Sequence, residues 1–303
     1  MDLARKKKTL YYNSRLIKTL SMSLLVFAFN CSGFFASKMV NPIDGAEIGN
    51  IDNAGKKLYY YTVGNEKSQP VVFLHGLLAF TEAYSELIER LSQRYYVIGI
   101  DLAGHGRSSI DTSNFSFNNI VSDILSVTNY LQVDRFHIVG HSAGGFLALY
   151  ITKLFPDKVL KVVSIASLYN DEGINFRPKN DYLTSTGFVD NHDGSNSYVI
   201  KVFDQAYKDI NEEHKFDRTK SLMMKYGISM YPTFTDNDLM DIDIPTLVII
   251  AENDTRIKPE HTTRMGELLP NSELLKIKGG RHFSVIKRKK SLDTIVEKIF
   301  QFL

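Results

Sequence analysis

The stretch 136–150 constrains the fold of this chain more than any other. It opens with four β-favouring residues, continues through the turn Gly140-x-Ser142-x-Gly144, and passes into a helical pattern over 143–155. Glycine on both sides of the serine permits a sharp, strained turn, because a side chain there would collide with the neighbouring strand or helix. The serine hydroxyl would then project above the edge of a sheet and face the partly positive N-terminus of the helix.

Short apolar segments alternate with amphipathic helical patterns through most of the chain. From about residue 46 the expected strands include 57–63, 71–74, 95–100, 136–139, 161–166, 246–250 and 274–277. Helices with an apolar face are expected at 84–91, 120–131 and 295–303. Such alternation predicts an α/β fold with a mostly parallel central sheet flanked by helices.

In this context the serine turn resembles the nucleophile elbow of the α/β-hydrolase family, in which G-x-S-x-G joins a strand to a helix. Taken alone, the motif also fits a glycine-rich turn with an ordinary capping serine. The resemblance covers nearly everything from about residue 46 to residue 303. It implies the α/β-hydrolase fold, with a core formed by residues 46–167 and 244–303.

Residues 168–243 interrupt the alternation after the sixth strand and far exceed a normal connection of about 2–6 residues. In the α/β-hydrolase family, an insert at this place is a helical cap that roofs the active site. The insert carries a helical pattern over 198–210 and half of the eight methionines: Met223, Met224, Met230 and Met240. We expect most of its methionine and aromatic side chains to form the core of the cap. A minority should line the pocket and favour an apolar part of the substrate.

The first 37 residues are predicted to be a signal or targeting segment. Six basic residues, opposed by one acid, precede an apolar core over 20–29 that is too short to span a bilayer as a helix. Cys31, the one cysteine, ends this core, which resembles a bacterial lipoprotein signal except that Asn30 stands where a small residue is usual. Three interpretations stay open: a lipoprotein signal ending at Cys31, a simple cleaved signal peptide, and an uncleaved N-terminal membrane anchor. All three predict export to the periplasm, the cell envelope or the outside.

The basic pI of the whole chain is no sign of a nucleic-acid partner, and we expect none. Without the first 37 residues, 30 basic and 33 acidic residues remain, so the basic pI reflects the leader. Because no cysteine follows residue 31, the folded part has neither disulfides nor a thiolate metal site. We expect no cofactor and no metal, and the expected partner is a small-molecule substrate with an apolar part.

Attack on an ester carbonyl needs a nucleophile, a base that takes its proton, and an acid that orients the base. Ser142 is the candidate nucleophile. Among eight histidines, His282 alone comes just beyond the last strand, on a loop begun by Gly279-Gly280 that resembles the histidine loop of the family. We therefore predict His282 as the general base. The other histidines lie in a strand, in the insert, on a helix or in turns: His137, His192, His214, His261, His75, His105 and His141.

The orienting acid should follow an apolar strand at the same edge of the sheet. Asp254, after the strand 246–250, meets this requirement and resembles the acid position of the family, whose order is serine, acid, histidine. Glu252, two residues earlier, and Asp171, after the preceding strand, are the alternatives. Asp254 could also be a structural residue that only caps the helix from Pro259.

Two backbone N–H groups are predicted to stabilise the oxyanion that forms during attack. His75-Gly76-Leu77 follows the strand 71–74, and the resemblance implies that the N–H of Leu77 points at the substrate. The N–H of Ala143, at the start of the elbow helix, is the second expected donor. His75 and His141 would shape the turns beside the nucleophile.

The set Ser142, Asp254 and His282 predicts a cofactor-free serine hydrolase that cleaves a carboxylic ester or related acyl compound through an acyl-enzyme. Carbon–carbon bond hydrolases of meta-cleavage products, lactonases, peroxidase-like hydrolases and aminopeptidases share this site in the family and remain alternatives. Ser142 argues against dehalogenases and epoxide hydrolases, which use Asp at the elbow. A non-catalytic hydrolase-fold ligand-binding protein is an alternative of another class, but it would not need all three residues.

Overall fold

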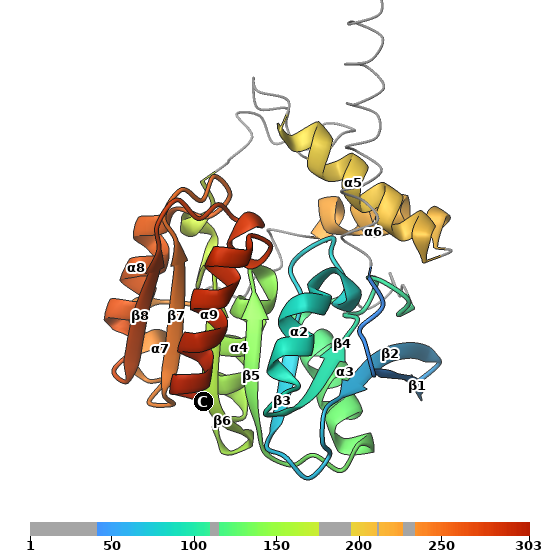
Figure 1. The fold of residues 1–303 in the computed structure, drawn as a ribbon, viewed down its shortest axis with the longest axis horizontal. Coiled ribbons are helices and arrows are strands. Elements are labelled where there is room, and N and C mark those ends of the chain that lie inside the picture. Colours follow the sequence, from blue (N-terminus) through green and yellow to red (C-terminus); the bar gives the residue numbers. More distant parts are fainter. Residues whose placement is uncertain (1–40, 110–114, 176–194, 211, 227–233) are drawn as a thin grey trace, which may run out of the picture.

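The computed structural model describes residues 41–109, 115–175, 195–210, 212–226 and 234–303 of the 303-residue chain (Figure 1). Within these residues one mixed sheet forms the centre of the molecule, and helices cover both of its faces. The predicted leader 1–37, with Cys31, lies outside the described residues. Among the residues that are described, no helix is both long and apolar enough to cross a lipid bilayer.

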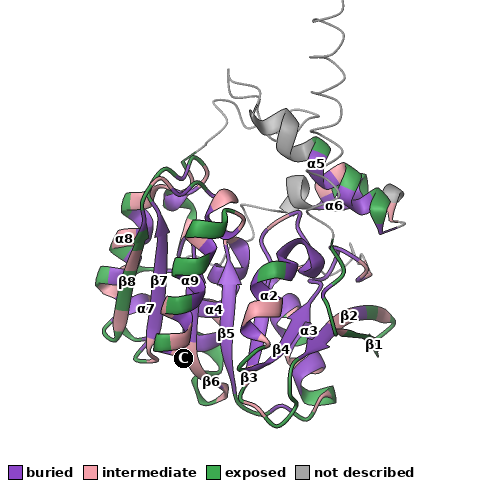
Figure 2. Cartoon of the chain, viewed as in Figure 1, coloured by how far each residue is buried: buried purple, intermediate pink, exposed green. Residues whose placement is uncertain are grey.

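Eight strands form the sheet: β1 (Glu47–Asn53), β2 (Lys56–Val63), β3 (Pro70–Leu74), β4 (Tyr96–Ile100), β5 (Phe136–His141), β6 (Val159–Ile165), β7 (Thr246–Ala251) and β8 (Ser272–Ile277). Their order across the sheet is β1-β2-β4-β3-β5-β6-β7-β8. The pairs β1·β2 and β2·β4 are antiparallel, and the pairs from β4 to β8 are parallel. The central strands are buried on both faces, which explains their continuous apolar sequences (Figure 2).

The described helices comprise those that cover the two faces of the sheet and those of the insert. They are α2 (Ser85–Leu91), α3 (Phe117–Tyr130), α4 (Ala143–Leu154), α5 (Ser195–Asp209), α6 (Glu213–Tyr226), α7 (Asp236–Met240), α8 (Pro259–Leu268) and α9 (Lys289–Phe302), with short 3₁₀ turns η1 (Thr81–Tyr84), η2 (Pro156–Lys158), η3 (Asp171–Gly173) and η5 (Ser284–Ile286). α2 and α9 pack on one face against side chains such as Phe73 and Leu247. α3, α4 and α8 pack on the other face against Ile138 and Val248. The predicted architecture, a mostly parallel sheet flanked by helices, is confirmed.

The insert after β6 places α5 and α6 at the carboxyl end of the parallel strands (Figure 1). Tyr207 of α5 is fully buried, and its ring lies 5.2 Å from that of Phe80. The Tyr207 hydroxyl accepts the N–H of Gly106 at 3.1 Å, and Thr219 of α6 donates its hydroxyl to the carbonyl of Gly104 at 2.5 Å. These contacts hold both helices against the turns that follow β3 and β4.

The last part of the insert packs against the core. Phe234 is buried, with its ring 5.7 Å from that of Phe146 in α4, and α7 follows it beside α8. Met240, at the end of α7, is exposed to solvent, so this methionine does not line a buried pocket. For the other three methionines of the insert, the side chains lie outside what the structure describes: Met223, Met224 and Met230.

The predicted elements are present with small shifts at their ends. The strand expected at 136–139 continues to His141, because the backbone of His141 still pairs with Ile165 of β6. The helix expected at 84–91 begins instead as the turn η1, in which Tyr84 is the last residue, and then continues as α2. Both shifts occur at the carboxyl edge of the sheet, where the predicted site residues also lie.

Candidate active site

Ser142 stands at the apex of the turn between β5 and α4 in a strained backbone conformation. Its φ of 54° and ψ of −121° are rare for any residue other than glycine. Glycine is required on both sides. A Cβ atom on Gly140 would lie 2.2 Å from the carbonyl oxygen of Gly144, and one on Gly144 would lie 2.1 Å from that of Leu74. The N–H of Ser142 donates to the carbonyl of Ile165 at 2.9 Å, so the elbow is fixed to the neighbouring strand.

Ser142, His282 and Asp254 form a continuous hydrogen-bonded chain. The Nε2 atom of His282 lies 2.9 Å from the hydroxyl oxygen of Ser142, and its Nδ1 lies 2.7 Å from Oδ2 of Asp254. Because a carboxylate only accepts, Nδ1 carries the hydrogen, and Nε2 is left to accept the serine hydroxyl. His282 and Asp254 are 8% and 6% exposed. Three residues from loops after β5, β7 and β8 are therefore brought together in a largely buried site.

Asp254 is held as a carboxylate. Its Oδ1 accepts the N–H groups of Arg256 at 2.8 Å and Ile257 at 3.0 Å. Burial acts to raise the pKa of Asp254, but the facing His282 and the hydrogen bonds outweigh burial and leave the pKa below its ordinary value. The negative charge therefore persists near neutral pH, where it would stabilise a proton taken up by His282.

Glu252 lies in a different place from Asp254, although only one residue separates them. The Oε2 atom of Glu252 accepts the N–H of Gly279 at 2.8 Å, and the N–H of Glu252 donates to the carbonyl of Ile277 at 3.2 Å. Glu252 thus supports the turn that precedes His282 and does not orient the imidazole. Asp171, the other alternative, is exposed in η3.

The turn after β3 carries Leu77, one of the two predicted oxyanion donors, and lies against the elbow, whose helix carries the other, Ala143. A Cβ atom on Gly76 would lie 3.2 Å from the Cβ of Ser142, so this turn touches the candidate nucleophile. Leu78 has a φ of 62°, a strained value for a residue with a side chain. The N–H of Leu77 has no hydrogen-bond partner in the described part of the chain. Ala143 is the first residue of α4, where N–H groups lack an acceptor within the helix.

Three further histidines near the carboxyl edge are buried in the neutral form. His75 donates from Nδ1 to the carbonyl of Gly76 at 2.8 Å and accepts at Nε2 the N–H of Leu102 at 3.0 Å, which shapes the turn after β3. Burial lowers the pKa of His75 to about 4. Burial, reinforced by a neighbouring imidazole, lowers the pKa values of His105 and His141 to about 3. Such neutral, buried rings suit structural roles in the turns.

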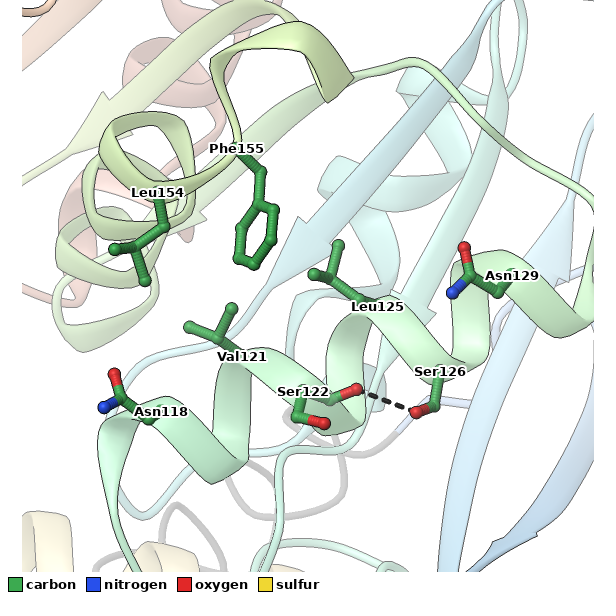
Figure 3. Close-up of a pocket in the computed structure, with 8 residues that line it drawn as sticks. All are labelled: Asn118, Val121, Ser122, Leu125, Ser126, Asn129, Leu154 and Phe155. Atoms are coloured by element: carbon green, nitrogen blue, oxygen red, sulfur yellow. Dashed lines mark hydrogen bonds between the residues drawn. The ribbon is translucent and has the colours of Figure 1, made fainter.

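A separate groove of about 490 Å³ opens between α3 and the end of α4 (Figure 3). None of the predicted site residues lines it. Its lining is Asn118, Val121, Ser122, Leu125, Ser126, Asn129, Leu154 and Phe155. Across the described ranges, no group of three or more histidine, cysteine, aspartate or glutamate side chains is arranged to hold a metal ion.

Known proteins share both the sequence pattern and this architecture. A family model described as the alpha/beta hydrolase fold matches residues 69–192, which include the turn after β3 and the serine elbow. The chain has the α/β-hydrolase fold. A protein of Haemophilus influenzae, provisionally named an esterase/lipase, is 25% identical over 257 residues, covering 80% of this chain and 86% of that protein.

Two further similar proteins are comparably distant. The (E)-2-((N-methylformamido)methylene)succinate hydrolase of Acinetobacter baylyi is 23% identical over 234 residues, covering 74% of this chain and 86% of that enzyme. The structure of a meta-cleavage product hydrolase from Pseudomonas fluorescens superposes with a TM-score of 0.67 at 22% identity, covering 84% of this chain and 98% of that one. The family and these relatives support a hydrolase of the α/β fold.

Two residues of this α/β-hydrolase site were missed by sequence reasoning. The hydroxyl of Ser167 donates to the carbonyl of Ser142 at 2.7 Å, and the hydroxyl of Tyr84 accepts the N–H of Gly76 at 3.0 Å. The position of Ser167, just beyond the strand expected at 161–166, was a usable signal. Tyr84 offered none, because it fell on the apolar face of a helical pattern and its hydroxyl had no recognisable partner nearby.

Proposed function

We propose that the protein is a cofactor-free serine hydrolase that cleaves a carboxylic ester or related acyl compound through an acyl-enzyme. The observation that carries this proposal is the hydrogen-bonded chain from Ser142 through His282 to Asp254 at a strained elbow. A purely structural turn would need neither the strain at the serine nor an imidazole that accepts its hydroxyl. The proposed substrate is a small molecule with an apolar part.

In the proposed reaction, Ser142 Oγ attacks the carbonyl carbon while His282 Nε2 takes the hydroxyl proton. The carbonyl electron pair moves onto oxygen, and the N–H groups of Leu77 and Ala143 would stabilise the resulting oxyanion. The intermediate collapses as His282 returns the proton to the leaving alcohol, which leaves Ser142 acylated. A water molecule, deprotonated by His282, then releases the acid and restores the serine. Asp254 accepts the Nδ1–H throughout and stabilises the transient imidazolium.

Cleavage of a carbon–carbon bond in a meta-cleavage-type product is the second candidate. The likeness to a meta-cleavage product hydrolase favours it, and such a reaction could use the same three residues. A panel of p-nitrophenyl esters of increasing acyl length, run beside a ring-cleavage dienone, separates the two. A non-catalytic ligand-binding protein is the remaining alternative.

A fluorophosphonate probe tests the proposal directly, because only an activated serine reacts with it. We expect labelling of the wild-type protein and none of Ser142→Ala, with turnover of the best ester lowered by about 10⁴-fold or more. Ser126→Ala, at a half-buried serine on α3 whose hydroxyl donates to the carbonyl of Ser122, is the matched control and should behave as wild type. Retention of about a tenth of the activity by Ser142→Ala would contradict the assignment.

A further inference from the structure

Two buried side chains, Tyr84 and His141, connect the two loops that meet at Ser142. The N–H of Gly76 lies 3.0 Å from the hydroxyl oxygen of Tyr84, and this hydroxyl lies 2.9 Å from Nδ1 of His141. On the far side of the ring, Nε2 of His141 lies 2.9 Å from the carbonyl oxygen of His282. Tyr84 is 1% exposed and His141 is fully buried, so none of these three hydrogen bonds competes with water.

The direction of each hydrogen bond in this chain follows from the chemistry of its ends. The carbonyl of His282 can only accept, so Nε2 of His141 must carry the hydrogen. In the neutral ring Nδ1 is then an acceptor, which makes the Tyr84 hydroxyl its donor. The Tyr84 oxygen in turn accepts the N–H of Gly76. Every donor thus has one acceptor, and these hydrogen bonds admit a single arrangement.

Both members of this chain are kept neutral by burial. Burial and the adjacent His282 lower the pKa of His141 to about 3, and burial raises the pKa of Tyr84 above its ordinary value. The arrangement of donors and acceptors therefore does not change between weakly acidic and weakly alkaline pH. These hydrogen bonds therefore hold the same geometry throughout this pH range.

The sheet itself does not join the two loops. Gly76 follows β3 and His282 follows β8, and the strands β5, β6 and β7 lie between β3 and β8 in the sheet. Leu78, next to the predicted oxyanion donor Leu77, has a strained φ of 62°, so the turn after β3 needs support from outside. The contacts of Tyr84 and His141 provide such support across the site.

We propose that Tyr84 and His141 form a bridge that positions the oxyanion turn at 76–77 and the loop of His282 relative to each other across Ser142. The inference rests on the proposed hydrolase function, but it concerns different residues. Neither side chain hydrogen-bonds the hydroxyl of Ser142 or the imidazole of His282, so both are positioning residues. Catalysis is sensitive to such positioning, since a misplacement of about 1 Å can cost about 10²-fold in rate.

Tyr84→Phe tests the bridge, because it removes one oxygen and keeps the ring. Tyr207→Phe is the matched control: its hydroxyl is also buried and also accepts a backbone N–H, that of Gly106, but lies outside the bridge. We expect Tyr84→Phe to lower kcat by about 10-fold with KM changed less than about 2-fold. The loss should be constant across neutral pH. Tyr207→Phe should lower stability comparably and leave kcat near wild type.

Amide hydrogen exchange supplies a readout that does not require activity. The N–H groups of Val285 and Ile286 donate to the carbonyls of Arg281 and Phe283, so opening of the His282 loop is measurable there. In Tyr84→Phe we expect faster exchange both at Gly76 and in this loop. Faster exchange at Gly76 alone, or a loss of turnover no larger than that of Tyr207→Phe, would overturn the bridge. Wild-type protein that fails to react with the fluorophosphonate would refute the hydrolase, while the exchange data would still decide the bridge.

Discussion

Lowering the pH from about 7.5 to about 4.5 should destabilise the folded protein steeply, because three histidines are buried in their neutral form. Burial holds the folded pKa of His75 at about 4 and those of His105 and His141 at about 3. A histidine in the unfolded chain has a pKa of about 6.5. Protonating these rings in the fold would break the bonds in which His75 and His141 accept a hydrogen.

The sign of the effect follows from which state binds more protons. Above about pH 6.5 both states are neutral at these rings and the contribution is constant. As the pH falls below that value, the unfolded chain binds protons at these rings. The folded protein does not bind them until the pH reaches the folded pKa values of about 4 and about 3, so the free energy of unfolding decreases across this window. Each ring adds about 1.4 kcal/mol per pH unit, and three add about 4 kcal/mol per unit. The free energy of unfolding of a typical domain is about 5–15 kcal/mol, so we expect the protein to unfold within a few pH units below about pH 6.5.

Urea unfolding followed by circular dichroism at a series of pH values measures this slope. His105→Gln, outside the proposed catalytic machinery, should flatten the slope by about 1.4 kcal/mol per pH unit, the contribution of the one ring that is removed. His137 and His261, whose pKa values are also lowered by burial to about 4, act in the same direction. A free energy of unfolding that stays constant, or rises, between about pH 6.5 and 5 would refute the reasoning.

Two further predictions concern the acid and the leader. Asp254→Asn should lower turnover by at least about 10²-fold, because the imidazole of His282 loses its charged acceptor. Glu252→Gln should change turnover only a few-fold, because glutamine can still accept the N–H of Gly279. Steady-state kinetics on both variants decide this, and reversed effects would make Glu252 the orienting acid. If Cys31 is lipidated, the mature protein should partition into detergent, and Cys31→Ser should release it from the membrane or block its processing. A soluble mature protein that begins after residue 33 would contradict the lipoprotein interpretation.

Local patterns in the sequence were sufficient for seven of the eight strands and for the elbow turn, but not for β1 (Glu47–Asn53), and they marked His282 as the candidate base. Parallel strands buried on both faces need continuous apolar runs, so segments such as 71–74 and 246–250 indicate strands without any knowledge of their neighbours. The glycines around Ser142 are equally local, because the backbone of one turn excludes a side chain at Gly140 and Gly144. The position of His282 after the last strand follows from chain order alone.

Contacts between distant segments decided the rest, and no local pattern encodes them. Asp254 and Glu252 both follow β7, and only the return of the loop after β8 puts one against the imidazole and the other against Gly279. Tyr84 has the spacing of an apolar helix residue, and its hydroxyl acquires a function only when the fold brings His141, 57 positions later, within hydrogen-bond distance. Side-chain partners of this kind depend on how strands are ordered in the sheet, which the periodicity of a single segment does not determine.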